Sequence, residues 1–264
     1  MLLVISLFFS YVAHKILFFF AYQNYTNVIL FQTRKDFLFY IISPVLLIKQ
    51  KKDKYFSLYF YLGLGITLLW GILIATKLNE YLDILAINFV VGLVYLASLI
   101  IFILFLLYLS LFDLISFSIP EITTKRMILF CLIINIAFLV LRILLENTET
   151  SYVFGLIPLG TLSNLVAGLI GGLIIWLIVR LTNQRGMGDG DVDILASIGL
   201  MLGVPAVFYS FFYTLMAASA ISIVYVIIIR RYKNVLIPFV PFLATGYILT
   251  LVLQDYFVKL FQLY

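Results

Sequence analysis

The longest uncharged stretch of the sequence covers 36 residues, from Ile194 to Ile229. A helix needs only about 20 residues to cross the hydrocarbon core of a bilayer, so this stretch is too long for one crossing. It divides at Gly203-Val204-Pro205 into a short helix and a full-length one. The other long uncharged runs are solidly apolar, without the alternation of polar and apolar residues that is typical of barrel strands. The sequence therefore predicts an all-α integral membrane protein.

Composition excludes a soluble fold. Hydrophobic residues make up 65% of the chain and charged residues only 11%, against roughly 45–50% and 25% in ordinary globular proteins. The formal net charge is +5, and in a membrane protein an excess of Lys and Arg indicates orientation rather than binding to nucleic acid. Because Cys131 is the only cysteine, we expect neither an intramolecular disulfide nor a cysteine-based zinc cluster.

The uncharged runs predict a single polytopic domain over residues 1–264, built as a bundle of about eight transmembrane helices. His14 and Lys15 lie inside the first span, and Phe37–Ile48 is too short to cross and is expected at the membrane interface. The expected helices cover roughly residues 1–30, 56–76, 84–112, 127–146, 161–181, 191–203, 206–229 and 235–258.

The basic residues predict the orientation. Thirteen of the 17 Lys and Arg residues fall in alternate loops, and the positive-inside rule makes these loops cytoplasmic and both termini external. The first of these loops, about residues 31–55, is short and basic. The thirteen residues are Arg34, Lys35, Lys49, Lys51, Lys52, Lys54, Lys125, Arg126, Arg180, Arg185, Arg230, Arg231 and Lys233.

Several acids lie at the expected cytoplasmic ends of helices, where ionisable groups are costly and usually functional. Asp113 ends an uncharged stretch, and three aspartates occur in the glycine-rich segment from Gly186 to Asp193. This segment is not an EF-hand, because its sixth and twelfth loop positions are Ile194 and Leu200. It is not a phosphate-binding loop either, because no Lys-Ser or Lys-Thr pair follows. Two structural alternatives to a functional site remain. Asp113 could simply mark where a helix meets water, and the glycine-rich segment could be an ordinary turn between two helices.

Two acids on different helices at one membrane face suggest an aspartyl dyad. Peptide hydrolysis needs a base that activates water and an acid that polarises the carbonyl group. Two close carboxyl groups sharing one proton supply both, because like charges about 3 Å apart cannot both ionise. Asp113 and Asp191 are 78 residues apart in the sequence, so only the fold can bring them together.

Three segments resemble the type IV prepilin leader peptidase family, whose members are GxGD intramembrane aspartic proteases. Asp113–Pro120 is similar to the family's Asp-x6-Pro segment. Gly186–Gly199 (GMGDGDVDILASIG) is similar to its second signature, commonly GMGxGDxKLLAALG. Ile237–Leu243 (IPFVPFL) resembles its late IPFxPFL segment. The three matches come in family order and indicate a peptidase core over about residues 84–250.

The resemblance implies roles for individual residues. Asp113 and Asp191 would be catalytic, because the downstream match makes Asp191 the GxGD aspartate, with Gly188 and Gly190 as its glycines. The competing register, which makes Asp189 the GxGD aspartate, loses that downstream match. Supporting positions at the active site would be Gly188, Gly190, Pro120, Asp189 and Asp193.

The sequence departs from the family pattern in three places. Asp193 replaces the usual Lys, which is expected to raise the apparent pKa of the dyad. Glu121 replaces an Asn that often follows the Ile-Pro pair. The loop over residues 31–55 lacks the paired CxxC motifs that many bacterial members carry, which makes this a short form. In the family that loop is associated with zinc and with methylation of the new N-terminus, so we expect a peptidase without the N-methyltransferase activity.

The resemblance therefore implies an intramembrane aspartic endopeptidase in a bacterial plasma membrane, with its active site facing the cytoplasm. Its partners would be the lipid bilayer and prepilin-like substrates (pilin, pseudopilin or competence precursors), from which it removes a basic leader. No metal and no other cofactor is expected. One alternative is a proton- or cation-coupled transporter or channel that uses the intramembrane aspartates, although no inverted repeat is detectable. Others are a non-catalytic pilus or competence assembly subunit and a presenilin-type protease.

Overall fold

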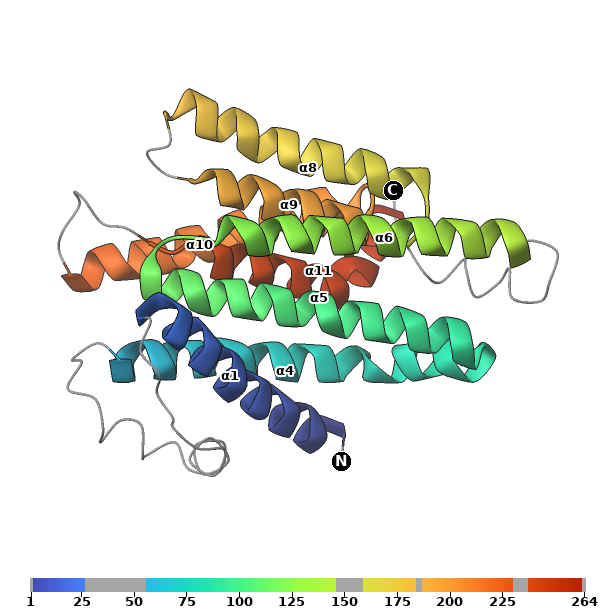
Figure 1. Cartoon of the computed structure of the whole chain (residues 1–264), viewed down its shortest axis with the longest axis horizontal. Helices are drawn as coiled ribbons and strands as arrows, with labels where there is room; N and C mark the ends of the chain where they lie inside the picture. Colours follow the sequence, from blue (N-terminus) through green and yellow to red (C-terminus); the bar gives the residue numbers. More distant parts are fainter. Residues whose placement is uncertain (1, 27–55, 146–158, 184–186, 230–236, 263–264) are drawn as a thin grey trace.

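The computed structural model describes residues 2–26, 56–145, 159–183, 187–229 and 237–262 of the chain. These residues form eight α-helices, and no strand occurs among them (Figure 1). The predicted all-α bundle is therefore confirmed. The helices are α1 (Leu2–Thr26), α4 (Phe56–Ile87), α5 (Phe89–Ser116), α6 (Glu121–Leu145), α8 (Leu162–Leu181), α9 (Asp189–Leu202), α10 (Ala206–Ile229) and α11 (Val240–Gln262).

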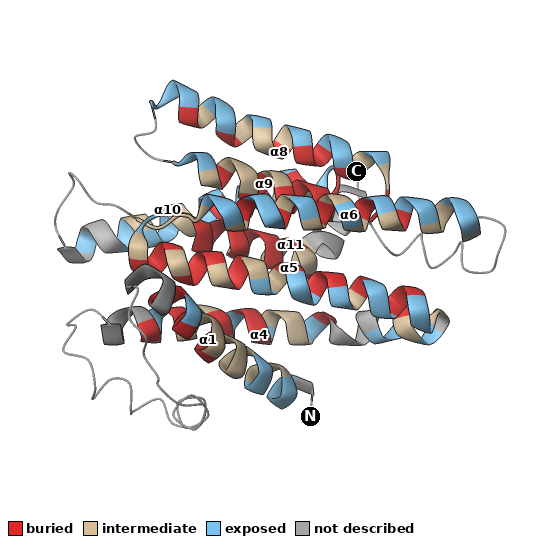
Figure 2. Cartoon of the chain, in the orientation of Figure 1, coloured by how far each residue is buried: buried red, intermediate tan, exposed pale blue. Residues whose placement is uncertain are grey.

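Six of the described helices are long and apolar enough to cross a membrane: α1, α4, α5, α6, α8 and α10. The apolar part of α11, Val240–Leu253, is shorter, and α9 has only 14 residues. Large apolar side chains such as Leu169 and Leu173 of α8 and Ile133 and Ile136 of α6 are exposed (Figure 2). In a chain this apolar, such faces contact lipid, so the protein is a multi-pass membrane protein.

Several expected helix boundaries are wrong. The span expected over 84–112 begins at Phe89 and continues to Ser116, so Asp113 lies inside α5 rather than after it. The span expected from residue 127 begins at Glu121. Uncharged runs mark the part of a helix that lies in hydrocarbon, whereas the helix itself extends through polar residues until a cap ends it. At the start of α5 that cap is Asn88, whose side chain accepts a hydrogen bond from Val91 N (3.1 Å).

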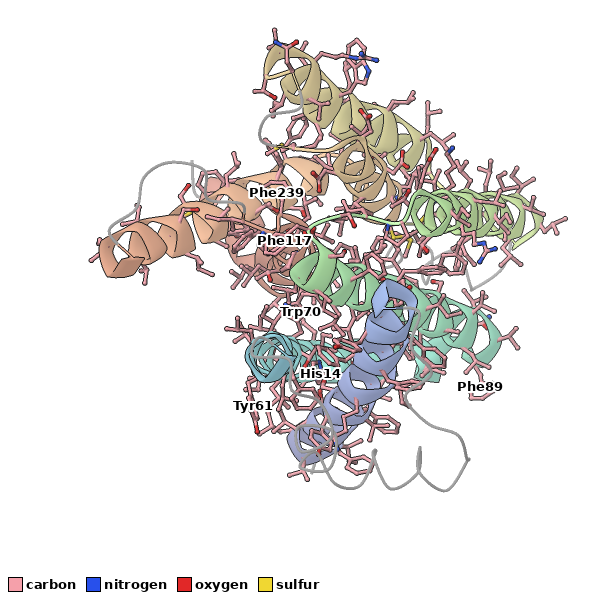
Figure 3. The ribbon with its side chains drawn as sticks, turned by 60° about the vertical axis from the view of Figure 1, so that its left-hand side comes forward. His14, Tyr61, Trp70, Phe89, Phe117 and Phe239 are labelled. Atoms are coloured by element: carbon pink, nitrogen blue, oxygen red, sulfur yellow. The ribbon has the colours of Figure 1, made fainter. Side chains whose placement is uncertain are left out.

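Some sequence predictions fall outside the described residues. These are the basic loop over residues 31–55, the interfacial segment Phe37–Ile48, and the continuation of the first span beyond Thr26. His14 and Lys15, which lie in that span, are both buried within α1. The ring of His14, which is labelled in Figure 3, contacts the ring of Phe60 on α4 (centroids 5.0 Å apart), and this contact joins the two helices.

Helix α5 runs through the middle of the bundle, with most of its residues near Asp113 buried (Figure 2). The rest of the core comes largely from α9 and α11, whose inward faces are buried over several turns. A hydrogen bond from Trp70 Nε1 to Thr245 Oγ1 (3.1 Å) connects α4 to α11. The central position of α5 places its polar groups away from lipid.

Helices α8 and α9 pack with their backbones in close contact, because glycines lie at the crossing. A Cβ atom at Gly199 would lie 2.3 Å from the carbonyl oxygen of Ala167, and one at Gly171 would lie 2.8 Å from that of Leu195. A Cβ atom at Gly168 would lie 2.7 Å from Leu200 Cγ. Side chains at these positions would force the helices apart, so α9 is held against α8 along its length.

The far end of α9 lies inside the bundle and needs hydrogen-bond donors there, because the last carbonyl groups of a helix have no partner within it. The side-chain amides of Asn135 on α6 and Asn164 on α8 both donate to the carbonyl oxygen of Leu200, each at 2.9 Å. The Asn135 Oδ1 atom accepts from Gly160 N (3.1 Å). These buried amides fix α9 between its two neighbours.

Candidate active site

Asp113 lies in the last turn of α5, and its carboxyl group is buried. Its Oδ2 atom accepts a hydrogen bond from the backbone N–H of Val240 (3.1 Å), the first residue of α11. The first N–H groups of a helix have no partner within the helix and carry a partial positive charge, so this position favours an anion. Phe117, which adopts a left-handed conformation (φ 50°), ends α5 immediately afterwards (labelled in Figure 3, as is Phe239).

Asp191 lies in the first turn of α9 and is also buried. Its Oδ2 atom accepts a hydrogen bond from the backbone N–H of Gly188 (2.9 Å), the residue that caps the helix. This is one half of a capping box. Its Oδ1 atom is buried without a hydrogen-bond partner among the described residues. Helix α9 is not one of the membrane-crossing helices. Burial raises the pKa of Asp191 to about 6, and the hydrogen bond from Gly188 N–H acts in the opposite direction by lowering it.

The fold brings the two carboxyl groups together. They lie near enough for their charges to repel each other, although they belong to helices that are far apart in the sequence. Each carboxylate faces the N-terminal end of a helix, α11 for Asp113 and α9 for Asp191, and these helix ends partly offset the repulsion. Two buried, neighbouring carboxyl groups can share a proton, with one acting as base and the other as acid.

The two glycines beside Asp191 have different surroundings. A Cβ atom at Gly190 would lie 2.9–3.1 Å from three side-chain carbons of Ile119, so the first turn of α9 packs directly against the chain between α5 and α6. A Cβ atom at Gly188 would meet nothing within 4 Å, and its φ of −98° suits any residue. Gly190 is therefore needed for packing, whereas the space around Gly188 is open.

The remaining expected site residues lie around this pair. Pro120 immediately precedes α6, where its carbonyl oxygen accepts from Thr123 N (2.9 Å). Asp189 is exposed at the start of α9. Asp193 is half-buried, and its carboxylate accepts a hydrogen bond from Thr124 on α6 (2.7 Å). Burial is the main cause of the raised pKa of Asp191, and the effect of Asp193 on the pKa of the pair stays a prediction.

Residues 100–227, which include both aspartates, match the sequence profile of the type IV leader peptidase family. The matched segment is similar to that family over just under half of the chain. The predicted resemblance is therefore confirmed for a segment that covers all of α9 and the C-terminal half of α5. The segments of the two helices that supply the carboxyl groups are thus part of what the chain shares with the family profile.

A curated relative carries a similar segment. The chain is 30% identical, over 92 residues, to the prepilin leader peptidase/N-methyltransferase of Bacillus subtilis (strain 168). The aligned part is 34% of this chain and 37% of that protein, so the chain spans little more than a third of the relative's length. No solved structure is significantly similar to the chain.

Sequence reasoning did not identify three contacts at the candidate site. These are the hydrogen bond from Thr124 to Asp193, the packing of Ile119 on Gly190, and the hydrogen bond from Val240 N to Asp113. The Ile237–Leu243 segment already carried a signal for the last of these, because it resembles a family motif and contains Val240. Within the described ranges, no group of three or more His, Cys, Asp or Glu side chains is arranged to hold a metal ion.

Proposed function

We propose that this protein is an intramembrane aspartic endopeptidase that cleaves the basic leader from prepilin-like precursors. The observation that carries the proposal is the pair of buried, mutually interacting carboxyl groups of Asp113 and Asp191 inside the family segment. Neither carboxylate forms an ion pair with a cation among the described residues, as a purely structural acid usually would. Buried carboxyl groups without a cationic partner are expected where chemistry needs them.

In the proposed mechanism one aspartate is ionised and the other protonated. The ionised carboxylate takes a proton from water, whose oxygen attacks the carbonyl carbon of the scissile peptide bond. The protonated carboxyl group donates a hydrogen bond to the carbonyl oxygen as negative charge develops there. The proton taken from water then passes to the leaving nitrogen as the C–N bond breaks, and the pair returns to one shared proton.

The unpartnered Oδ1 atom of Asp191 supports this assignment, because it is an acceptor with no function in holding the fold. The choice of Asp191 over Asp189 as the catalytic residue is supported by burial: Asp191 is buried and Asp189 is exposed. The open space at Gly188, three residues from Asp191, lets an extended peptide backbone approach the acids.

The proposed location is the cytoplasmic face of a bacterial plasma membrane. Helices α5, α6, α9 and α11 present their aspartate-bearing or aspartate-binding ends at the same end of the bundle, which we call the aspartate end (Figure 1). Lys125 and Arg126 of α6 and Arg180 of α8 belong to this end as well. An excess of basic residues on one side supports a cytoplasmic position for it.

The test is cleavage of a co-expressed prepilin, read as a mobility shift on a gel and by mass of the product. Asp113→Asn and Asp191→Asn should each abolish cleavage while the protein still accumulates in the membrane, and the double variant should be no worse than either one. Asp189→Asn is the matched control, because it removes an exposed carboxylate two residues away and should retain activity. Full activity in Asp191→Asn, or an inactive Asp189→Asn with an active Asp191→Asn, would refute the assignment.

A further inference from the structure

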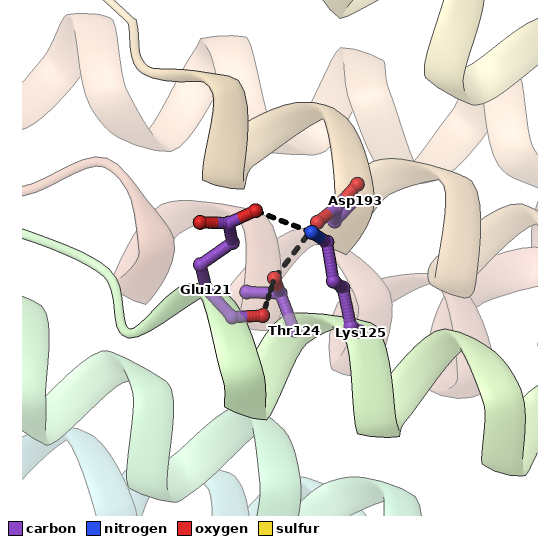
Figure 4. A network of polar contacts seen from close by, with 4 residues as sticks. All are labelled: Glu121, Thr124, Lys125 and Asp193. Carbon is purple, nitrogen blue, oxygen red and sulfur yellow. Dashed lines mark hydrogen bonds and ion pairs between the residues drawn. The ribbon is translucent and has the colours of Figure 1, made fainter.

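A hydrogen bond between two helices lies next to the proposed catalytic pair. The hydroxyl group of Thr124 on α6 donates to Asp193 Oδ2 on α9 at 2.7 Å (Figure 4). Thr124 is fully buried. Its hydroxyl also lies 3.0 Å from the carbonyl oxygen of Glu121, so the single hydroxyl hydrogen is shared, with the shorter contact going to Asp193.

The ammonium group of Lys125 lies near the hydrogen bond between Thr124 and Asp193. Lys125, the neighbour of Thr124, forms an exposed ion pair with Glu121, and its charge also interacts with that of Asp193 (Figure 4). Asp193 is therefore bound by a neutral donor and faced by a positive charge, both from α6. A charged acceptor makes the hydrogen bond stronger than a neutral one would be.

The contact fixes the side of α9 on which Asp191 lies. Successive helical residues are about 100° apart, so Asp191 and Asp193 point to nearly opposite sides of α9. When Asp193 is held against α6, Asp191 is turned toward α5 and α11. One residue before Asp191, Gly190 packs on Ile119 of the chain that leads into α6. The first turn of α9 is thus attached at two points to the segment that follows Asp113.

We propose that Thr124 and Asp193 are positioning residues of the active site. By holding the first turn of α9 against the start of α6, they set the rotation of α9 that directs Asp191 toward Asp113. The inference rests on the proposed peptidase function for its kinetic consequences, but the contact itself can be tested without it. Neither residue touches the reacting atoms; both act through the position of Asp191.

The first experiment compares Thr124→Val and Thr124→Ser in purified protein with a prepilin substrate. Valine keeps the shape and removes the donor, so kcat should fall roughly 10- to 100-fold, since displacements of about 1 Å have effects of this size. KM should stay the same, because the contact does not involve substrate. Serine keeps the hydroxyl and should restore most of kcat. Thr123→Val is the matched control, because it alters the adjacent, half-buried threonine and should leave both constants unchanged.

The second experiment does not depend on activity. In a Cys131→Ala background, the pair Asp113→Cys and Asp191→Cys should be linked efficiently by a short bifunctional thiol reagent, and adding Thr124→Val should reduce the yield several-fold. Adding Thr124→Ser should not. If wild-type protein cleaves no prepilin but the cross-linking follows this pattern, the peptidase proposal fails and the positioning contact stands. If Thr124→Val changes neither cross-linking nor kcat, the positioning proposal is refuted.

Discussion

Replacing Gly190 by alanine tests whether the close contact between α9 and Ile119 controls catalysis. The added Cβ atom would lie 2.9 Å from Ile119 Cβ, 3.0 Å from Cδ1 and 3.1 Å from Cγ2. Carbon atoms are normally about 3.5–4.0 Å apart in contact, so the first turn of α9 or the chain at Ile119 must move by roughly 0.5–1 Å. Asp191, the next residue, moves with it.

The size of the effect follows from this displacement. Overpacking costs about 1–3 kcal/mol, and alanine regains up to about 1 kcal/mol over glycine in a helix. Gly190→Ala should therefore destabilise the protein by no more than about 2 kcal/mol and still allow it to fold. Activity is more sensitive, because a shift of about 1 Å in a catalytic group can reduce the rate roughly 100-fold. We expect kcat to fall between roughly 10- and 100-fold.

The assay is leader cleavage by purified protein in detergent or nanodiscs, with kcat and KM measured together and thermal unfolding recorded in parallel. Gly188→Ala is the matched control, since its Cβ atom would meet nothing within 4 Å. It should leave kcat nearly unchanged and raise KM, because it narrows the open space proposed for the substrate. The reasoning would be refuted if Gly190→Ala kept the wild-type kcat. It would also be refuted if Gly188→Ala lowered kcat while Gly190→Ala only raised KM.

Four further predictions concern other parts of the molecule. Asp191→Asn should raise thermal stability at pH 7 but not at pH 4. Burial raises the pKa of the Asp191 carboxyl group to about 6, so this group destabilises the fold once it is ionised. The loss of stability is about 2–3 kcal/mol for a pKa shift of this size. Asn135→Ala should lower stability by about 1–3 kcal/mol, because it leaves the Gly160 N–H group without its acceptor and removes one donor from the Leu200 carbonyl; unchanged unfolding would contradict this. Cysteines introduced at Arg126 and Thr182 should be labelled only from the cytoplasm and one at Leu144 only from outside, so that labelling of the first two from opposite faces would contradict a common aspartate end. The cleaved product should be unmethylated and its formation unaffected by zinc chelation, because the loop over residues 31–55 has no cysteine; a uniform mass increase of one methyl group, with this protein as the sole candidate methyltransferase, would refute that.

The all-α, membrane-spanning fold could be predicted from the sequence because each crossing requires a long uncharged run, and the chain contains few charged residues to interrupt such runs. Helix ends could not, because they depend on local caps such as Asn88 and on charged residues that continue a helix past the hydrocarbon. This is why α6 begins at Glu121, six residues before the uncharged run that starts at Met127. The same limit placed Asp113 after α5 instead of within its last turn.

The candidate site was only partly accessible to sequence reasoning. The order of the motifs indicated Asp113 and Asp191, and the structure places their carboxyl groups within electrostatic range. The contact between Thr124 and Asp193 joins residues 69 positions apart, and no local pattern in α6 marks Thr124 as a partner. The replacement of the family's Lys by Asp193 indicated a change of charge, but it did not indicate that the carboxylate accepts a hydrogen bond from α6. Side-chain direction is decided by the packing of whole helices, which a motif does not record.

The close approach of α8 and α9 has a consequence for how related sequences can differ. Gly168 faces Leu200, Gly171 faces the backbone at Leu195, and Gly199 faces Ala167. A larger residue at position 168 leaves no room for the side chain of Leu200, so these two positions cannot vary independently. Among homologous chains, substitutions at 168 and 200 should therefore occur together, with gain of volume on one helix matched by loss on the other. Gly199, which meets backbone atoms that no substitution can remove, should not vary at all.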